Sequence, residues 1–349
     1  MQNVSVVTGV ESYLYRDKVI TIMLMFGRMY RLNEYVVKAN KVIDQVNRVI
    51  LGKEREVKEV MTAFLAGGHI LLEDIPGVGK TTLATAFSRA MKLDCKRVQF
   101  TPDVMPSDLT GYSVYRSDIG QFVYQPGSVF CNLLLADEIN RTSPKTQSAL
   151  LEVMEERKVS VEGITRDVPD PFIVIATQNP YGNAGTQSLP EAQMDRFMIT
   201  MSIGYPDFDN ELDMAMSVGR GGRADIVEAV ISADDVKHMQ EEIYEVYINK
   251  SIYKYIVGLV RETRNSAYIE RGASPRATIA LVKMSKAWAW LNGRDYVIPS
   301  DVGAQFEYVI SHRIVPDMSA RMEKMSKQDI IKNIIKAVKR PVVGEKSTD

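Results

Sequence analysis

The chain has 349 residues, and its 43 lysine and arginine side chains nearly balance its 44 aspartate and glutamate side chains, giving a formal net charge of −1. A near-neutral chain has no general attraction to nucleic acid or to an anionic membrane surface, and this length allows about two domains with a large core. The cysteines Cys95 and Cys131 are too few for a disulfide framework or a cysteine-based metal site, so we expect a reduced, cytoplasmic environment.

Residues 1–37 are expected to form an N-terminal extension outside the main fold. The run Val19–Phe26 is apolar, but its eight residues are far fewer than the roughly twenty that a transmembrane helix needs, so no membrane span is predicted. Basic residues precede this run, as in a signal peptide, but residues 27–30 offer no small-residue cleavage site. The extension is either a packing element or the product of a start codon upstream of the true one, with Met29 as the alternative start.

Residues 71–82 combine an apolar strand, a glycine-rich loop and the start of a helix. Gly77 and Gly79 let successive backbone N–H groups face phosphate oxygens, and the helix adds the positive end of its dipole. Lys80 can reach the β- and γ-phosphates, and the Thr81 hydroxyl can bind magnesium. An ordinary strand-to-helix turn is the alternative. The residues predicted to bind nucleotide here are Pro76, Gly77, Val78, Gly79, Lys80, Thr81 and Thr82.

A second apolar strand, residues 131–136, ends in two carboxylates. Asp137 can hold Mg²⁺ through its ligand shell, and Glu138 can polarise a water for in-line attack on the γ-phosphate. Two surface acids after a buried strand are common, so this pattern is specific only together with the phosphate loop. The pair of motifs predicts hydrolysis of ATP. One departure is Asp74, because the strict loop pattern has glycine at that position.

Two later segments place further polar groups at the ends of secondary-structure elements. An apolar strand over residues 172–177 is followed by Asn179, which could hold the attacking water or the γ-phosphate, or could simply belong to a turn before Pro180. A short helix within residues 189–197 ends at Arg196, far along the chain from its own phosphate loop. The alternative for this arginine is a surface ion pair with Asp195, which contributes little stability.

Strands and helices alternate over residues 38–205, which predicts a parallel α/β core with its site at the carboxyl ends of the strands. Residues 111–130 and 157–166 interrupt that alternation as predicted β-hairpins, which need not have any partner. A linker over 206–232 is expected to precede an all-α lid over 233–340 and a tail over 341–349. The lid helices are predicted near residues 233–245, 251–263, 274–291, 299–311 and 326–338.

In this order, the motifs resemble those of the MoxR family of AAA+ ATPases, over about residues 41–338. That family lies in the helix-2-insert group, with magnesium chelatase subunits and replicative helicases as relatives. The resemblance implies that the two hairpins are the helix-2 insert and the pre-sensor-1 hairpin, and that Asp74 is a familiar variant. The roles it implies are Walker A for Lys80 and Thr81, Walker B for Asp137 and Glu138, sensor 1 for Asn179, the arginine finger for Arg196, and sensor 2 on the lid for Arg276.

The resemblance further implies ATP and Mg²⁺ as cofactors, with the metal held by Thr81 and Asp137 and the nucleotide lying between core and lid. Hydrolysis is expected between subunits of a homo-oligomeric ring, a hexamer by resemblance. Family members commonly work with von Willebrand factor A domain proteins to mature or assemble other proteins, so such a partner and an unidentified client are implied. A nucleic-acid-dependent motor is the alternative, although the neutral charge disfavours it. Glu138 and Arg196 disfavour a third possibility, a nucleotide-sensing switch with little turnover.

Overall fold

The computed structural model describes residues 34–179, 189–217 and 226–341. Its core is a five-stranded parallel sheet in the order β2-β5-β8-β1-β9. Parallel pairing brings the carboxyl ends of these strands to one edge of the sheet. The predicted α/β core is thereby confirmed. The strands are β1 (Ile70–Glu73), β2 (Cys95–Gln99), β5 (Leu133–Asp137), β8 (Ile173–Gln178) and β9 (Ile199–Met201).

Helices cover both faces of this sheet, as its apolar strands require. In β5, Leu133 and Leu135 contribute to the core cluster that contains helices α2 (Glu54–Leu65) and α3 (Lys80–Ala90). The alternating Leu134 and Ala136 contribute to the cluster on the other face, with helix α5 (Pro144–Glu156). Successive side chains of a strand point to opposite faces, so this strand is buried on both faces of the sheet.

Residues 34–47 form a helix, so the boundary expected after residue 37 is wrong. Val36, Ala39, Ile43 and Val46 are all buried, and their spacing of three and four residues makes one apolar stripe against the core. The expectations for residues 1–33 lie outside the described residues.

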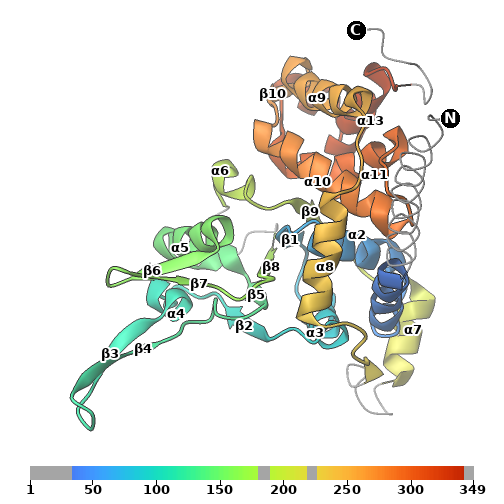
Figure 1. Ribbon diagram of the computed structural model, residues 1–349. Coiled ribbons are helices and arrows are strands. Elements are labelled where there is room, and N and C mark those ends of the chain that lie inside the picture. The colour runs from blue at the N-terminus through green and yellow to red at the C-terminus, as the bar shows by residue number, and fades with distance from the viewer. Residues whose placement is uncertain (1–33, 180–188, 218–225, 342–349) are drawn as a thin grey trace, which may run out of the picture.

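Both predicted hairpins are present and touch each other. Helix α4 (Pro106–Thr110) leads into β3 (Tyr112–Arg116) and β4 (Gln121–Gln125), and α5 leads into β6 (Lys158–Val161) and β7 (Ile164–Asp167). The Ser113 hydroxyl donates to Glu162 Oε2 at 2.6 Å, and the Arg166 guanidinium lies 3.7 Å from the centre of the Tyr124 ring. Figure 1 shows the β3–β4 hairpin projecting away from the body of the molecule.

The lid lies at the opposite end (Figure 1) and contains the five predicted helices. A short antiparallel pair, β10 (Ile269–Arg271) with β11 (Val315–Pro316), accompanies them. The expected linker also holds a helix, α7 (Phe208–Ser217). None of the helices in the described parts of the chain is long and apolar enough to cross a bilayer. The lid helices are α8 (Ala233–Tyr244), α9 (Lys250–Asn265), α10 (Pro275–Leu291), α11 (Pro299–Ile310) and α13 (Lys327–Ala337), with a short α12 (Met318–Met322) between the last two.

Candidate functional site

A cavity of about 410 Å³ lies at the carboxyl edge of the sheet, where β1 turns into α3. Gly77 and Gly79 have φ angles of 90° and 92°, a backbone region that side chains strain, and this requirement accounts for the two glycines. The structure therefore brings most of the sequence-predicted residues into one cavity. Val78 belongs to the loop but is not among the described residues that line it. The lining residues are Pro76, Gly77, Gly79, Lys80, Thr81, Thr82, Arg97, Gln99, Asp137, Glu138 and Asn179.

The Lys80 ammonium lies inside the loop that precedes its helix. It donates to the carbonyl oxygens of Asp74 at 2.8 Å and of Ile75 at 3.1 Å. Burial lowers the pKa of this ammonium, and three nearby carboxylates oppose that shift. A cation at this position, next to the N-terminus of α3 with the positive end of its dipole, suits phosphate oxygens.

Asp137 and Glu138 are held in place by a hydroxyl from the neighbouring strand. The Thr177 hydroxyl donates to Asp137 Oδ1 at 2.7 Å and accepts from the Glu138 N–H at 2.8 Å. Glu138 itself has a φ of 57°, a left-handed conformation that is uncommon for a residue with a side chain. The turn directs the Glu138 carboxylate into the cavity that the phosphate loop lines.

Four residues that sequence reasoning missed contact these two acids. Arg97 Nη2 lies 2.7 Å from Asp137 Oδ2, and Gln99 Nε2 and Arg141 Nη1 each donate to Glu138 Oε2 at 2.8 Å. Thr177, described above, is the fourth. The sequence does place Arg97 and Gln99 two apart at the end of a strand, hence on one side of it, but only the pairing of β2 with β5 shows what they face.

The oxygen donors of Thr81 and Asp137 share this cavity and suit magnesium, which usually takes one or two protein ligands together with phosphate oxygens and water. No group of three or more histidine, cysteine or acidic side chains able to hold a metal by itself occurs in the described residues. Thr81 and Asp137 would supply the protein's share of the ligands to a magnesium ion bound together with nucleotide phosphates.

Asp74, the departure from the generic loop pattern, connects the loop to the last strand of the sheet. Its buried carboxylate accepts from the Ser202 hydroxyl at 2.6 Å and from the backbone N–H groups of Ile203 at 2.7 Å and Gly204 at 3.1 Å. A glycine could accept none of these hydrogen bonds. The aspartate thus fixes the chain where it leaves β9 against the base of the phosphate loop.

We expect Asp74→Ala to lower the free energy of unfolding by about 2–3 kcal/mol, because it leaves buried donors without their charged acceptor. Asp74→Asn keeps one acceptor oxygen, so its free energy of unfolding should fall by less. Urea unfolding followed by circular dichroism measures both values. An Asp74→Ala protein as stable as the parent would show that these hydrogen bonds do not hold the loop.

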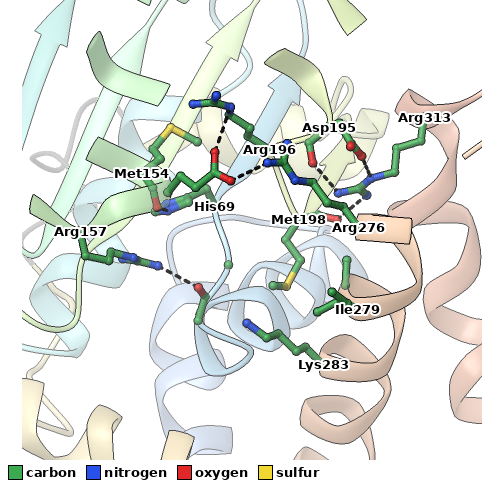
Figure 2. A pocket seen from close by; sticks show the side chains of 14 residues that line it. His69, Met154, Arg157, Asp195, Arg196, Met198, Arg276, Ile279, Lys283 and Arg313 are labelled. Atoms are coloured by element: carbon green, nitrogen blue, oxygen red, sulfur yellow. Dashed lines mark hydrogen bonds and ion pairs between the residues drawn. The ribbon is translucent and has the colours of Figure 1, made fainter. Parts of the chain in front are cut away.

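Arg196 and Arg276 lie elsewhere. They line a second cavity of about 280 Å³ (Figure 2). Both bind Glu155, with Arg196 Nε 3.3 Å from Oε2 and Arg276 Nη2 2.5 Å from Oε1. Arg276, expected on the lid as a nucleotide-binding residue, is therefore not among the described residues that line the chain's own phosphate-loop cavity. Asp195 accepts from the Ser274 hydroxyl at 2.7 Å, and this bond holds the start of α10 beside the turn after α6 (Glu191–Met194).

The surface ion pair considered for Arg196 is also not the one observed. Asp195 pairs with Arg313, whose Nε lies 2.7 Å from Asp195 Oδ1 and whose side chain is only 2% exposed. Arg313 further donates to the carbonyl oxygens of Phe197 and Met198. Asp195 and Arg313 thus form an ion pair at the junction between core and lid. Arg196 pairs with Glu155 instead of Asp195.

Comparisons with known proteins agree with this architecture. Residues 69–199 match the "ATPase family associated with various cellular activities (AAA)", and residues 261–334 match the AAA lid domain. The chain is 37% identical to "Chaperone MoxR1" of Mycobacterium tuberculosis over 313 residues, covering 87% of this chain and 82% of that one. It is 45% identical to the uncharacterized protein YeaC of Bacillus subtilis over 302 residues, covering 86% and 94%. A crystal structure from Cytophaga hutchinsonii, 38% identical, superposes with a TM-score of 0.85 over 92% of this chain and all of that one.

A parallel sheet with a phosphate loop, two acids at the end of a neighbouring strand and a helical lid defines an ATPase of the AAA class. Within that class, the chain belongs to the MoxR family.

Proposed function

We propose that this ATPase works as a homo-oligomeric ring, a hexamer by family resemblance, in which ATP binds at the interface between two subunits. The observation that carries the proposal is the position of Arg196 and Arg276. Both are absent from the described lining of the chain's own phosphate-loop cavity and lie together at a separate one. From this second cavity, the two guanidinium groups can bind a nucleotide phosphate only if that nucleotide belongs to another subunit.

In this proposal the loop N–H groups and Lys80 hold the β- and γ-phosphates, while Glu138 takes a proton from the attacking water and Asn179 orients that water. Bound Mg²⁺, held by Thr81 and Asp137, would neutralise charge on the phosphates. Arg196 and Arg276 of the adjacent subunit stabilise the charge that develops on the γ-phosphate. Thr177 and Gln99 keep the two acids oriented through the hydrogen bonds described above.

The output is proposed to be chaperone-like maturation or assembly of other proteins in the cytoplasm, together with a von Willebrand factor A domain partner. A related protein is named as a chaperone. The projecting hairpins offer exposed apolar side chains that suit polypeptide: Tyr115, Phe122 and Ile164 are each more than half exposed.

The same hairpins give little support to a nucleic-acid motor. Among the basic residues of the second hairpin, Arg157 donates to the backbone oxygens of Gly67 and Phe172, and Arg166 lies over the Tyr124 ring. Lys158 pairs with Asp167 at 3.4 Å. These side chains are already engaged within the chain, whereas nucleic-acid binding needs free cations along a common face.

ATP is expected to drive the Glu138→Gln protein from smaller species into a ring. This protein binds ATP without hydrolysing it, and Arg196 of each neighbouring subunit is still present to contact the γ-phosphate. Light scattering with and without ATP measures the mass, and Lys80→Ala supplies the control that should not respond. A Glu138→Gln chain that binds ATP yet remains a monomer at every micromolar concentration would contradict the ring.

A further inference from the structure

Glu155 joins the two arginines that the proposed function assigns to the neighbouring subunit's nucleotide. Arg196 comes from the turn between α6 and β9 in the core, and Arg276 comes from the first turn of α10 in the lid. Figure 2 shows both side chains in one pocket with Asp195 and Arg313. A single carboxylate from the last turn of α5 therefore binds two guanidinium groups that the sequence separates by 80 residues.

The charge of this pocket is unbalanced. Two carboxylates, those of Glu155 and Asp195, face five cationic side chains among the described lining residues. Asp195 is committed to the buried Arg313 and to the Ser274 hydroxyl, so Glu155 is the carboxylate that meets Arg196 and Arg276. The cationic lining residues are Arg157, Arg196, Arg276, Lys283 and Arg313.

The donors that Glu155 uses are those that a phosphate would need. A guanidinium group uses the same N–H donors to form charge-assisted hydrogen bonds with a carboxylate or with a phosphate. A carboxylate left beside an arriving γ-phosphate would also repel it. Glu155 and the phosphate of a neighbouring subunit consequently compete for one pair of arginines.

We infer that Glu155 is a positioning residue that holds Arg196 and Arg276 in a subunit that has no nucleotide-loaded neighbour, and yields them to the neighbour's γ-phosphate when the ring closes around ATP. The inference rests on the proposed function. Exchange is feasible because the pairs are exposed, with the side chains of Glu155, Arg196 and Arg276 exposed by 38%, 31% and 49%. Exposed ion pairs are weak, and a polyphosphate carries more charge than a carboxylate.

Other contacts keep Glu155 in place and keep the lid attached without it. Arg157, the left-handed residue that ends α5, donates to the backbone oxygens of Gly67 and Phe172 and so anchors the end of that helix. The junction between core and lid is held by the bonds of Asp195 with Arg313 and Ser274. Replacing Glu155 should therefore leave the fold intact.

The test compares ATP-driven assembly of Glu138→Gln with that of Glu138→Gln carrying Glu155→Gln. At saturating ATP, the protein concentration at half-assembly should fall by about three- to tenfold, the scale of two exposed ion pairs that no longer compete. Glu152→Gln is the matched control, because Glu152 lies one turn earlier on α5, exposed and without an ion pair among the described residues. Sedimentation velocity over a concentration series gives each value, and the control should equal its parent.

A second arm asks whether the effect runs through an arginine. Adding Arg276→Ala to both proteins should shrink the gain from Glu155→Gln, as a double-mutant cycle measures, whereas a merely structural role would leave that gain unchanged. An unchanged or higher half-assembly concentration with Glu155→Gln would overturn the inference alone. A Glu138→Gln parent that does not assemble with ATP would overturn the proposed ring and the inference together.

Discussion

Glu138→Gln is expected to bind ATP as tightly as the parent chain and to hydrolyse it about 10²–10⁴ times more slowly, the usual contribution of a general base. The substitution keeps the size of the side chain and the acceptor oxygen for Gln99 and Arg141, so the geometry around Thr177 should survive. What it removes is the group able to take a proton from water. Lys80→Ala should instead lose ATP binding, because it deletes the cation that faces the phosphates.

Binding of labelled ATP and steady-state phosphate release separate these two outcomes. Glu156→Gln, an exposed acid at the end of α5, is a suitable control and should retain both properties. Parental turnover by Glu138→Gln would show that another group activates the water.

Arg196→Ala is expected to reduce turnover by about 10³–10⁵, the range that arginine fingers contribute in other systems. ATP binding to the same subunit should persist, since Arg196 lies outside the described lining of its phosphate-loop cavity. Measuring turnover and ATP affinity on one preparation distinguishes the finger from a general loss of structure.

Arg271→Ala provides the matched control for Arg196→Ala. Arg271 is another exposed arginine near this junction, and its ion pair is with Glu191 instead of Glu155. Its replacement should leave turnover within about twofold of the parent, as expected for an exposed ion pair. Turnover in Arg196→Ala equal to that in Arg271→Ala would remove Arg196 from the hydrolysis mechanism.

The sequence predicted the segments of the nucleotide cavity because each has a local signal. A glycine loop before Lys80, a strand that ends in acids at Asp137, and a strand followed by Asn179 can all be found without knowing what lies beside them. Parallel pairing then brings their ends together. That general rule is enough to predict that the two Walker segments lie together.

The sequence did not predict the contacts that depend on strand order and on how the lid sits. Gln99 reaches Glu138 because β2 pairs with β5. Nothing in the sequence of either strand predicts that they are neighbours in the sheet. Arg313 meets Asp195 across 118 residues, and Asp195 also accepts from Ser274, two residues before Arg276. Amphipathic periodicity locates the lid helices along the chain but does not predict how α10, the helix that carries Arg276, is oriented against the core.

The most direct test of hydrolysis between subunits is a mixing experiment with two inactive proteins. Arg196→Ala keeps Lys80 and Glu138 but has no finger, and Glu138→Gln keeps Arg196 but cannot activate water. Steady-state phosphate release is measured across mixing ratios, with subunit exchange verified by a separate label. Activity is expected to return in mixed rings, where Arg196 of a Glu138→Gln subunit reaches the intact site of an Arg196→Ala subunit. Near-zero release at every ratio, with exchange established, would contradict hydrolysis between subunits.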